Sequence, residues 1–299
     1  MELIYNIAEN KEAVEKSLMK HGYAAEHNLF HYLSQEGPHK ENVFFHHEAH
    51  KGIMARKHRN GLWHTFSDVL APEKERMKIF ESFLAHIFGT ENANKIVVEA
   101  HSSFFSDIKK NLPSLYKLCR INYTLHWPVF EMKKWDTALS GKEFKKLRNI
   151  KNNFFKLHKV EVVDSASVDR EKLKQIVRDW RKSRGGADYA YYHAFLNLIE
   201  SGFEGIDNAR TLVVDGIPST ITAGWKIPNT NNYYSAIGLL NYKFPGLGEA
   251  ANILDLNELK QQGYDLVDFG GSDEDLLRFK NKFRPSSVYQ THIFSIKKA

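Results

Sequence analysis

The sequence contains almost no cysteine and no long apolar segment. Cys119 is the only cysteine among 299 residues, which excludes an intrachain disulfide and argues against a cysteine-based metal site. The apolar runs, such as 236–240, are far shorter than the roughly 20 residues that a membrane-spanning helix needs. The first residues lack the basic stretch and following apolar stretch of a secretory signal. We therefore expect a reduced, cytoplasmic protein without a transmembrane segment.

The composition is that of a globular protein with a substantial core, because 42% of the residues are hydrophobic and 26% are charged. This excludes disordered, collagen-like and coiled-coil proteins. The net charge of +6 favours anionic partners, such as nucleic acid, an anionic lipid surface or a phosphate-bearing cofactor. Residues 141–160 contribute much of this charge, with seven Lys or Arg against one Glu. A solvated helix face is the alternative explanation for these lysines.

Periodicity and turn signals predict the same order of elements in both halves of the chain. The first half predicts a helical stretch (11–33), three strands (42–48, 52–58, 62–70), a helix (72–88), a strand (95–100), a short helix (104–110) and a final strand (115–132). The second half predicts a strand (159–163), two helices (170–182, 189–199), three strands (211–215, 219–227, 232–240), a helix (249–262), a strand (264–269), a helix capped by Ser272 and a final strand (287–296). We therefore predict an α/β (α+β) fold with an internal duplication. Each half is expected to form a mixed, largely antiparallel sheet flanked by helices.

A glycine-rich turn precedes the helix predicted at 249–262. It consists of Lys243, Phe244, Pro245, Gly246, Leu247, Gly248 and Glu249. Such a turn directs unpaired backbone N–H groups outward at the positive end of the helix dipole, where a phosphate or pyrophosphate binds well. A simple turn is the alternative, because Gly-x-Gly alone is a weak signal.

This turn resembles the pyrophosphate loop of the Gcn5-related N-acetyltransferase (GNAT) superfamily, Gln/Arg-x-x-Gly-x-Gly/Ala, which also follows the third strand of a meander. Gly246 and Gly248 match the pattern, and Lys243 replaces the usual Gln or Arg. The resemblance implies a coenzyme A thioester as co-substrate, bound by Lys243, Gly246, Leu247 and Gly248. Backbone N–H groups near Gly238 and Leu239 are candidates for polarising the acyl carbonyl.

Two further segments resemble the C-terminal catalytic domain of lysyl-phosphatidylglycerol synthases. They are 139–149 (LSGKEFKKLRN) and 276–285 (LLRFKNKFRP). The resemblance implies tandem GNAT-like domains, of which the first has lost the cofactor loop. It gives a degenerate domain at 1–136 and a catalytic domain at 137–299. It also implies aminoacyl-tRNA as an alternative donor, with the basic segment 142–159 contacting the RNA backbone. Lys280 and Lys282 are candidates for binding a phosphate or carboxylate, with a surface role as the alternative.

Transfer to an amine needs a group that accepts a proton, because a lysine-type amine has a pKa of about 10.4. Asp268, on the strand after the glycine-turn helix, and Glu249, at the start of that helix, are the best-placed acids. Either can instead be structural, since Glu249 suits the helix dipole and Asp268 can cap the following turn. Tyr289, like Tyr233 and Tyr234, is a candidate proton donor to the leaving group, or an aromatic core residue.

No metal site is expected. The segment His46-His47-Glu48-Ala49-His50 is one residue short of the His-Glu-x-x-His spacing that places two imidazoles on one helix face. Packing or surface histidines are the simpler interpretation.

These features predict an N-acyltransferase that moves an acyl group from an acyl-coenzyme A thioester to a primary amine by direct attack. The acceptor can be a peptide, a small molecule or a lipid head group. The alternatives are an aminoacyl-tRNA-dependent transferase and a non-catalytic basic module that binds nucleic acid. The sequence leaves the oligomeric state open.

Overall fold

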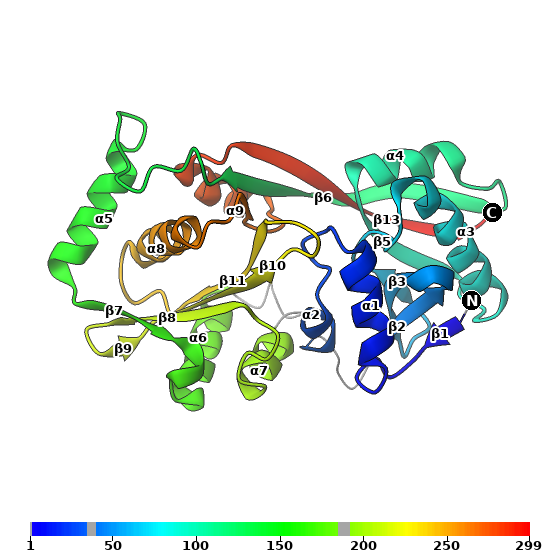
Figure 1. The fold of residues 1–299 in the computed structure, drawn as a ribbon, viewed down its shortest axis with the longest axis horizontal. Coiled ribbons are helices and arrows are strands. Elements are labelled where there is room, and N and C mark those ends of the chain that lie inside the picture. The colour runs from blue at the N-terminus through cyan, green and yellow to red at the C-terminus, as the bar shows by residue number, and fades with distance from the viewer. Residues whose placement is uncertain (1, 35–39, 185–191) are drawn as a thin grey trace.

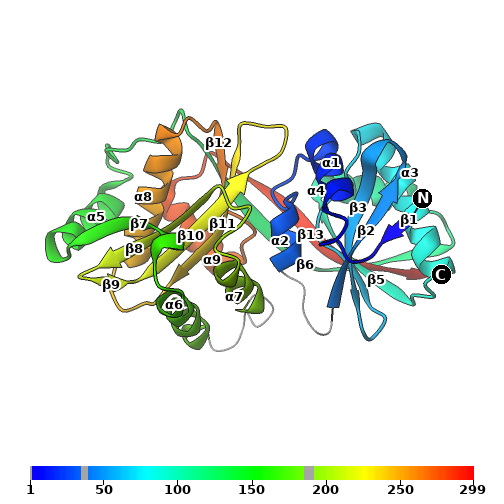
Figure 2. The same cartoon turned by 60° about the horizontal axis from the view of Figure 1, so that its bottom comes forward.

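The computed structural model describes residues 2–34, 40–184 and 192–299. Two halves lie side by side along the longest axis, and one 13-stranded sheet runs through both (Figures 1 and 2). The strand order is β1-β2-β3-β4-β5-β13-β6-β12-β11-β10-β8-β7, and β9 pairs with β8 outside this path. The pairs β4/β5 and β11/β12 are parallel, and the other pairs are antiparallel.

The elements of the first half are β1 (Glu2–Ile4), α1 (Lys11–His21), α2 (Leu29–Ser34), β2 (Lys40–His47), η1 (Glu48–His50), β3 (Lys51–His58), β4 (Trp63–Thr65), α3 (Glu73–Gly89), β5 (Lys95–His101), α4 (Ser102–Asn111) and β6 (Tyr116–Glu131). Those of the second half are α5 (Lys145–Leu157), β7 (Val160–Asp164), η2 (Ser165–Ser167), α6 (Arg170–Ser183), α7 (Tyr192–Glu200), β8 (Asn208–Val214), β9 (Ile217–Pro218), β10 (Thr220–Lys226), β11 (Tyr233–Leu240), α8 (Leu247–Gln261), β12 (Leu266–Asp268), α9 (Glu274–Lys280), η3 (Asn281–Phe283) and β13 (Ser287–Lys298).

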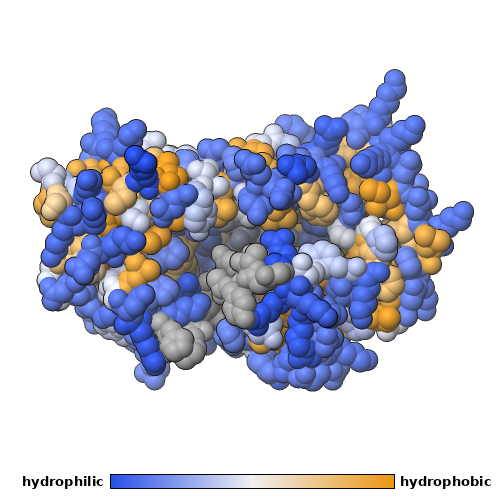
Figure 3. Space-filling view, turned by 180° about the vertical axis from the view of Figure 1, so that it is seen from behind, coloured by the Kyte–Doolittle hydropathy of each residue, from blue (hydrophilic) through white to orange (hydrophobic). Residues whose placement is uncertain are grey.

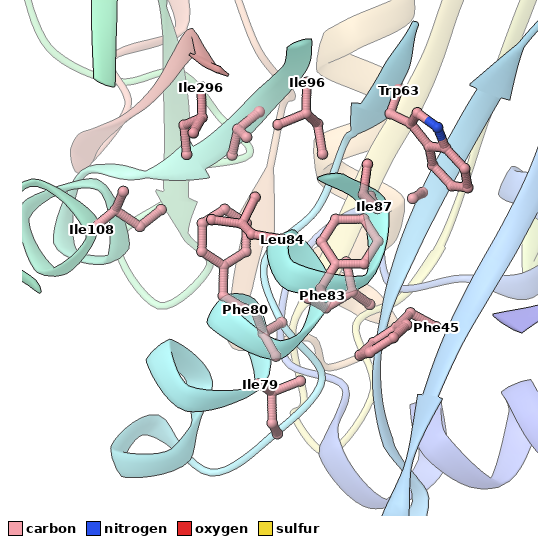
Figure 4. Packing of buried hydrophobic residues seen from close by; sticks show 14 of the residues in the cluster. Phe45, Trp63, Ile79, Phe80, Phe83, Leu84, Ile87, Ile96, Ile108 and Ile296 are labelled. Carbon is pink, nitrogen blue, oxygen red and sulfur yellow. The ribbon is translucent and has the colours of Figure 1, made fainter. Parts of the chain in front are cut away.

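The sheet of the first half is covered by helices on both faces. Side chains alternate along β2, so that Val43 and Phe45 face one cluster while Phe44 faces the other. Helix α3 buries its apolar residues, including Phe80 and Phe83, in the first cluster (Figure 4). Helices α1 and α2 pack on the opposite face. Burial on both faces explains the nearly continuous apolar runs of β2 and β3.

The second half is built in the same way. Helices α6 and α7 pack on one face of β10 and β11 through a cluster that includes Trp180 and Leu198. Helices α5 and α8 cover the other face, where Phe154 of α5 contacts the apolar residues of α8. Apart from the two-residue strand β9, both halves follow the predicted order of three strands, a helix, a strand, a helix and a final strand.

The last strands of the two halves are exchanged. The C-terminal strand β13 lies between β5 and β6, where Thr291 pairs with His101 on one side and Leu125 on the other. Strand β6, in turn, pairs with β12 of the second half. Residues of β13 therefore reach the junction between the halves. The division at 136/137 remains a prediction for the domain boundary.

Two local expectations differ from the structure, and part of a third lies outside the described residues. Asp273, rather than Ser272, caps α9, because its carboxylate accepts a hydrogen bond from the Leu276 N–H at 2.8 Å. The Ser272 hydroxyl instead donates to the Gly270 carbonyl at 3.1 Å. The strand expected over 62–70 is limited to β4, since the chain turns toward α3 after it. Residues 189–191 of the expected helix 189–199 lie outside the described residues.

The surface seen from behind is largely hydrophilic, with smaller apolar patches between the polar side chains (Figure 3). Within the described parts of the chain, no helix is both long and apolar enough to cross a membrane.

Candidate active site at the junction of the two halves

Asp268 is held at the end of the short strand β12. This strand pairs in parallel with β11, where Tyr234 lies beside Asp268, and antiparallel with β6. The chain then turns at Gly270, whose φ of +78° favours glycine. The Gly270 N–H donates to Oδ1 of Asp268 at 2.8 Å. Asp268 is only 5% exposed, and burial raises the pKa of its carboxyl to about 6.

Tyr289 of β13 donates its hydroxyl to Oδ2 of Asp268 at 2.6 Å. Its ring is stacked between His101, at a centroid distance of 4.5 Å, and Trp127, at 5.5 Å. Burial and the neighbouring Asp268 raise the pKa of the Tyr289 hydroxyl far above its ordinary value. The phenol therefore stays protonated and acts as a donor. The stack fixes the ring, so the hydroxyl is aimed at the carboxylate.

These two residues line a cavity of about 410 Å³, which we name the junction cavity. Both halves of the chain contribute to it. The lining residues are Tyr23, Ala24, Ala25, Glu26, Phe66, Ser67, Asp68, Arg76, Glu99, Ala100, His101, Ser103, Val129, Ile227, Asn232, Leu266, Asp268, Ser287, Tyr289 and Thr291. The volume is within the range of about 300–1,000 Å³ that is common for small-molecule sites.

The junction cavity is strongly acidic. Four carboxylates line it, from Glu26, Asp68, Glu99 and Asp268. Within the described residues, none of the four forms an ion pair, and their hydrogen-bond donors are neutral groups. Arg76 and Lys280 act on Asp68 and Asp268 only from beyond ion-pair distance, and they lower these pKa values less than burial raises them. Buried carboxylates without a paired cation are costly to ionise. A cationic ligand would remove that cost, so the cavity suits an ammonium group.

The protonation of these carboxylates reflects this environment. Burial raises the pKa of Glu99 to about 7, although Thr291 donates to it at 3.1 Å. Burial raises the pKa of Glu26 well above its usual range, and the charge of Glu99 is the second-largest cause. Burial also raises the pKa of Asp68, which accepts hydrogen bonds from the Tyr23 hydroxyl and the His101 N–H, both at 3.1 Å. Near neutral pH these carboxyl groups are therefore partly protonated.

Lys280 lies behind Asp268 rather than in the lining of the cavity. Its Nζ donates to the carbonyls of Phe269 and Gly270, the latter at 3.1 Å. Burial lowers the pKa of Lys280 to about 8, although the charge of Asp268 opposes this effect. The lysine thus stabilises the turn that follows β12 and holds the Gly270 N–H against Asp268. Its predicted role toward a cofactor phosphate remains a prediction.

The glycine turn lies at the N-terminus of α8. Gly246 is its N-cap with a φ of +84°, and a Cβ there would be 3.0 Å from Ile150. A Cβ at Gly248 would be 3.3 Å from the Phe279 ring. Close packing against Ile150 and Phe279 is therefore sufficient to explain both glycines, whether or not a phosphate binds at this turn. Leu247 between them is buried in the core under α5.

The charged residues near this turn are already paired. Glu249 lies in the first turn of α8, and one of its carboxylate oxygens is 2.8 Å from Nζ of Lys282. Lys243 Nζ is 4.0 Å from a carboxylate oxygen of Asp179 on α6. A carboxylate thus already complements the dipole of α8. Glu249 and Lys282 do not line the junction cavity.

Gly238 and Leu239 lie on β11 beyond the end of its pairing with β12. They are opposite Thr222 and Ile221 of β10. Leu239 is buried in the cluster under α6, whereas Gly238 is exposed and no atom surrounds its Cβ position. The open space at Gly238 is compatible with the predicted approach of an acyl group.

The structure brings together two of the residues selected from the sequence, Asp268 and Tyr289, and adds three carboxylates from the first half. Glu99 could have been selected from the sequence, because a charged residue within the apolar strand Lys95–His101 indicates a functional or paired side chain. Asp68 and Glu26 follow no pattern, since they lie outside helices and strands. Among the described residues, no group of three His, Cys, Asp or Glu side chains is arranged to hold a metal ion, and this includes His46 and His50.

A parallel strand pair around one helix occurs in each half, within a largely antiparallel sheet flanked by helices, and GNAT-like solved structures share this fold. The predicted fold class is confirmed. Residues 38–291 match the family described as "Phosphatidylglycerol lysyltransferase, C-terminal", so the chain belongs to that family. This membership confirms the predicted enzyme class, a transferase of acyl or aminoacyl groups. A search of curated proteins found no match.

Several solved structures share the fold at low sequence identity. A conserved protein of unknown function from Bacteroides thetaiotaomicron aligns with a TM-score of 0.72 and 13% identity, covering 99% of this chain and 100% of that chain. The structure of L-PGS from Bacillus licheniformis aligns with a TM-score of 0.67 and 15% identity, covering 96% and 91%. A tandem GNAT protein from the clavulanic acid biosynthesis pathway aligns with a TM-score of 0.58 and 10% identity, covering 99% and 98%.

Proposed function

We propose that the chain transfers an aminoacyl or acyl group to a primary amine, and that this amine binds as an ammonium ion in the junction cavity. The observation that carries the proposal is the Asp268–Tyr289 pair, joined by a 2.6 Å hydrogen bond, in a cavity with three further carboxylates. The carboxylates attract the ammonium group, and the enclosed site orients it.

Asp268 accepts a proton from the bound ammonium group. Each of its oxygens accepts one hydrogen bond and retains a lone pair for the amine. The neutral amine then attacks the carbonyl carbon of the donor ester or thioester. A C–N bond forms, and the C–O or C–S bond of the donor breaks. With a pKa of about 6, Asp268 is ionised at neutral pH and ready for this step.

Tyr289 is placed to return a proton to the leaving group. Its phenol remains protonated because burial and Asp268 raise its pKa. As the leaving oxygen or sulfur gains charge, the hydroxyl donates its proton and recovers one from the protonated Asp268. This relay leaves both residues in their starting states. The ammonium nitrogen loses two protons in forming the amide: the relay passes one to the leaving group, and the tetrahedral intermediate releases the other to solvent as it collapses.

The preferred donor is an aminoacyl-tRNA. The family description names a lysyltransferase. The ion pair of Glu249 with Lys282 occupies the charged surroundings of the α8 N-terminus, where a coenzyme A pyrophosphate would otherwise bind. The exposed lysines of the α5 region, such as Lys145 and Lys156, are available for contacts with an RNA backbone.

A coenzyme A thioester is the second candidate donor. The left-handed Gly246 and the following turn have the form that exposes backbone N–H groups at the start of a helix. Binding of a pyrophosphate there requires that Lys282 leave Glu249 or bridge to the ligand. The acceptor site and the proton relay are the same for both donors.

A transfer assay tests the proposal. The purified chain is incubated with labelled lysyl-tRNA or acetyl-coenzyme A and with amine acceptors such as L-lysine or cadaverine, and amide products are identified by mass spectrometry. We expect a new amide with one of the two donors, and its loss in Asp268→Asn. If neither donor yields a product with any amine, the proposed function is wrong.

A further inference from the structure

Arg76 is the one arginine that lines the otherwise acidic junction cavity, among the residues that the structure describes. It lies in the first turns of α3. Its Nε donates to the Ala71 carbonyl at 3.1 Å, and its guanidinium carbon lies 3.9 Å from the centroid of the Tyr23 ring. The side chain is therefore held at both its edge and its face before any ligand binds.

The two terminal nitrogens of Arg76 have no hydrogen-bond partner within residues 2–34, 40–184 and 192–299. No carboxylate of these residues forms an ion pair with it either. Its charge acts on Asp68 of the same cavity, whose pKa Arg76 lowers less than burial raises it. A guanidinium presents its remaining N–H groups as a planar fork that fits the two oxygens of a carboxylate. Because the stack on Tyr23 already fixes the plane, little further entropy is lost when such a group binds.

The charges of the cavity thus have a distinct pattern. The cavity's four carboxylates can bind positively charged ligand groups, and its one fixed guanidinium can bind a single anionic group. A simple diamine would satisfy the carboxylates and leave Arg76 with Asp68 alone, whose charge it meets without forming an ion pair. A molecule with two amines and one carboxylate satisfies both kinds of group. A volume of about 410 Å³ is sufficient for a ligand of this size.

We propose that Arg76 binds the free carboxylate of the acceptor, which is a diamino acid of the lysine or ornithine type rather than a simple amine. The carboxylate lies on the fork of Arg76, and the amines lie among Glu26, Asp68, Glu99 and Asp268. This inference rests on the proposed function, since it names the class of acceptor for that site.

Isothermal titration calorimetry with two ligands tests the proposal. L-Lysine and L-lysinamide carry the same two amines, and only L-lysine has a carboxylate. At a pH of about 6.5 both amines of both ligands are protonated, because an α-amino group has a pKa of about 7.7 or higher. The measured quantity is the ratio of the dissociation constants of L-lysinamide and L-lysine.

We expect Arg76→Gln to lower this ratio by about tenfold or more relative to the wild type, as for loss of a charge-assisted hydrogen bond. Arg76→Lys keeps the charge but lacks the planar fork, so a smaller decrease in the same direction is expected. Arg278→Gln removes an exposed arginine of α9 and serves as the matched control, with an unchanged ratio. Equal ratios in the wild type and both Arg76 variants would overturn the proposal. Should Arg76→Gln fail to fold, the ratio measured for Arg76→Lys tests the proposal alone, and a ratio equal to that of the wild type would overturn it.

The transfer assay separates this inference from the proposed function. With the wild type, we expect L-lysine to be acylated more efficiently than cadaverine, which lacks the carboxylate. Equal transfer to both amines would contradict the role of Arg76 and leave the transferase proposal intact. Absence of transfer to any amine would contradict both.

Discussion

The hydroxyl of Tyr289 lies 2.6 Å from Oδ2 of Asp268. The two residues belong to different strands, β13 and β12, and β6 lies between these strands in the sheet. Strand β13 is inserted between β5 and β6, which places its side chains at the junction of the halves. The exchange of the last strand thus connects this pair with Glu99 of β5, to which Thr291 of β13 donates at 3.1 Å, and both halves line the cavity.

Replacement of Asp268 by Asn should reduce the transfer rate by about 10²–10⁴-fold, because the amide cannot accept the proton of the ammonium group. The side chain keeps its shape and can still accept the Gly270 N–H, so the fold should remain. Initial rates at saturating acceptor provide the measurement. Asp273→Asn is the matched control, since Asn caps a helix about as well as Asp. A rate within twofold of the wild type in Asp268→Asn would contradict the assigned role.

Replacement of Tyr289 by Phe should move the acid limb of the pH–rate profile upward. The hydrogen bond from Tyr289 lowers the pKa of Asp268 and partly offsets the effect of burial. Without it, the pKa rises above about 6, and a higher pH is needed to ionise the carboxylate. The stacks on His101 and Trp127 need no hydroxyl, so the ring should stay in place. A limb that remains at the wild-type pH would show that the hydroxyl does not act on Asp268.

The contribution of Glu99 to the free energy of unfolding should fall as the pH rises from about 4.5 to about 7. Burial raises the pKa of Glu99 to about 7 in the folded chain, whereas an unfolded chain has the ordinary value. At Glu99 the folded state therefore binds more protons in this interval, and this contribution to stability decreases with pH. His27, His31 and His64, whose pKa values burial lowers, contribute in the opposite direction. Glu99→Gln should make the change of melting temperature from pH 5 to pH 8 more favourable than in the wild type, because a neutral amide replaces the ionising group. The exposed Glu15→Gln should show the same change as the wild type. An equal change in Glu99→Gln and the wild type would be inconsistent with a buried, titrating Glu99.

The two glycines of the α8 turn should differ in their tolerance of alanine. Gly246→Ala should destabilise the chain by about 1–2 kcal/mol, because its φ is +84° and the new Cβ would press on Ile150. Gly248→Ala should change the free energy of unfolding by less than about 1 kcal/mol, since higher helix propensity offsets the tight contact with Phe279. Urea unfolding measures both values. Equal effects of the two substitutions would argue against the left-handed N-cap.

Most of the fold was predictable from the sequence, because its elements have strong local signals. Helix α3 has a regular apolar period, and Gly263 with a φ of +82° follows α8 as expected for a helix end. The cap of α9 was misassigned, since Ser272 and Asp273 are adjacent and both suit the position. Strand exchange left no signal, because β13 alternates in the same way whichever neighbour it pairs with.

The site was predictable only in part. Asp268 and Tyr289 follow from chemistry and from the order of elements, yet nothing local in the sequence brings them into contact. The acidic character of the cavity depends on Glu26, Asp68 and Glu99, which belong to the half without the glycine turn. Their proximity to Asp268 arises from tertiary packing between segments that are far apart in the chain.

The central claim is that the carboxylates of the junction cavity receive an ammonium ion. Calorimetric titration of the wild type with L-lysine at pH 6.5, in two buffers with different ionisation enthalpies, tests it most directly. The bound ammonium favours ionised carboxylates, and Asp268 and Glu99 have pKa values of about 6 and about 7. The account therefore predicts net proton release at pH 6.5, less release at pH 8.5, and its reduction in Glu99→Gln. Binding without proton release, or no binding of L-lysine at all, would contradict it.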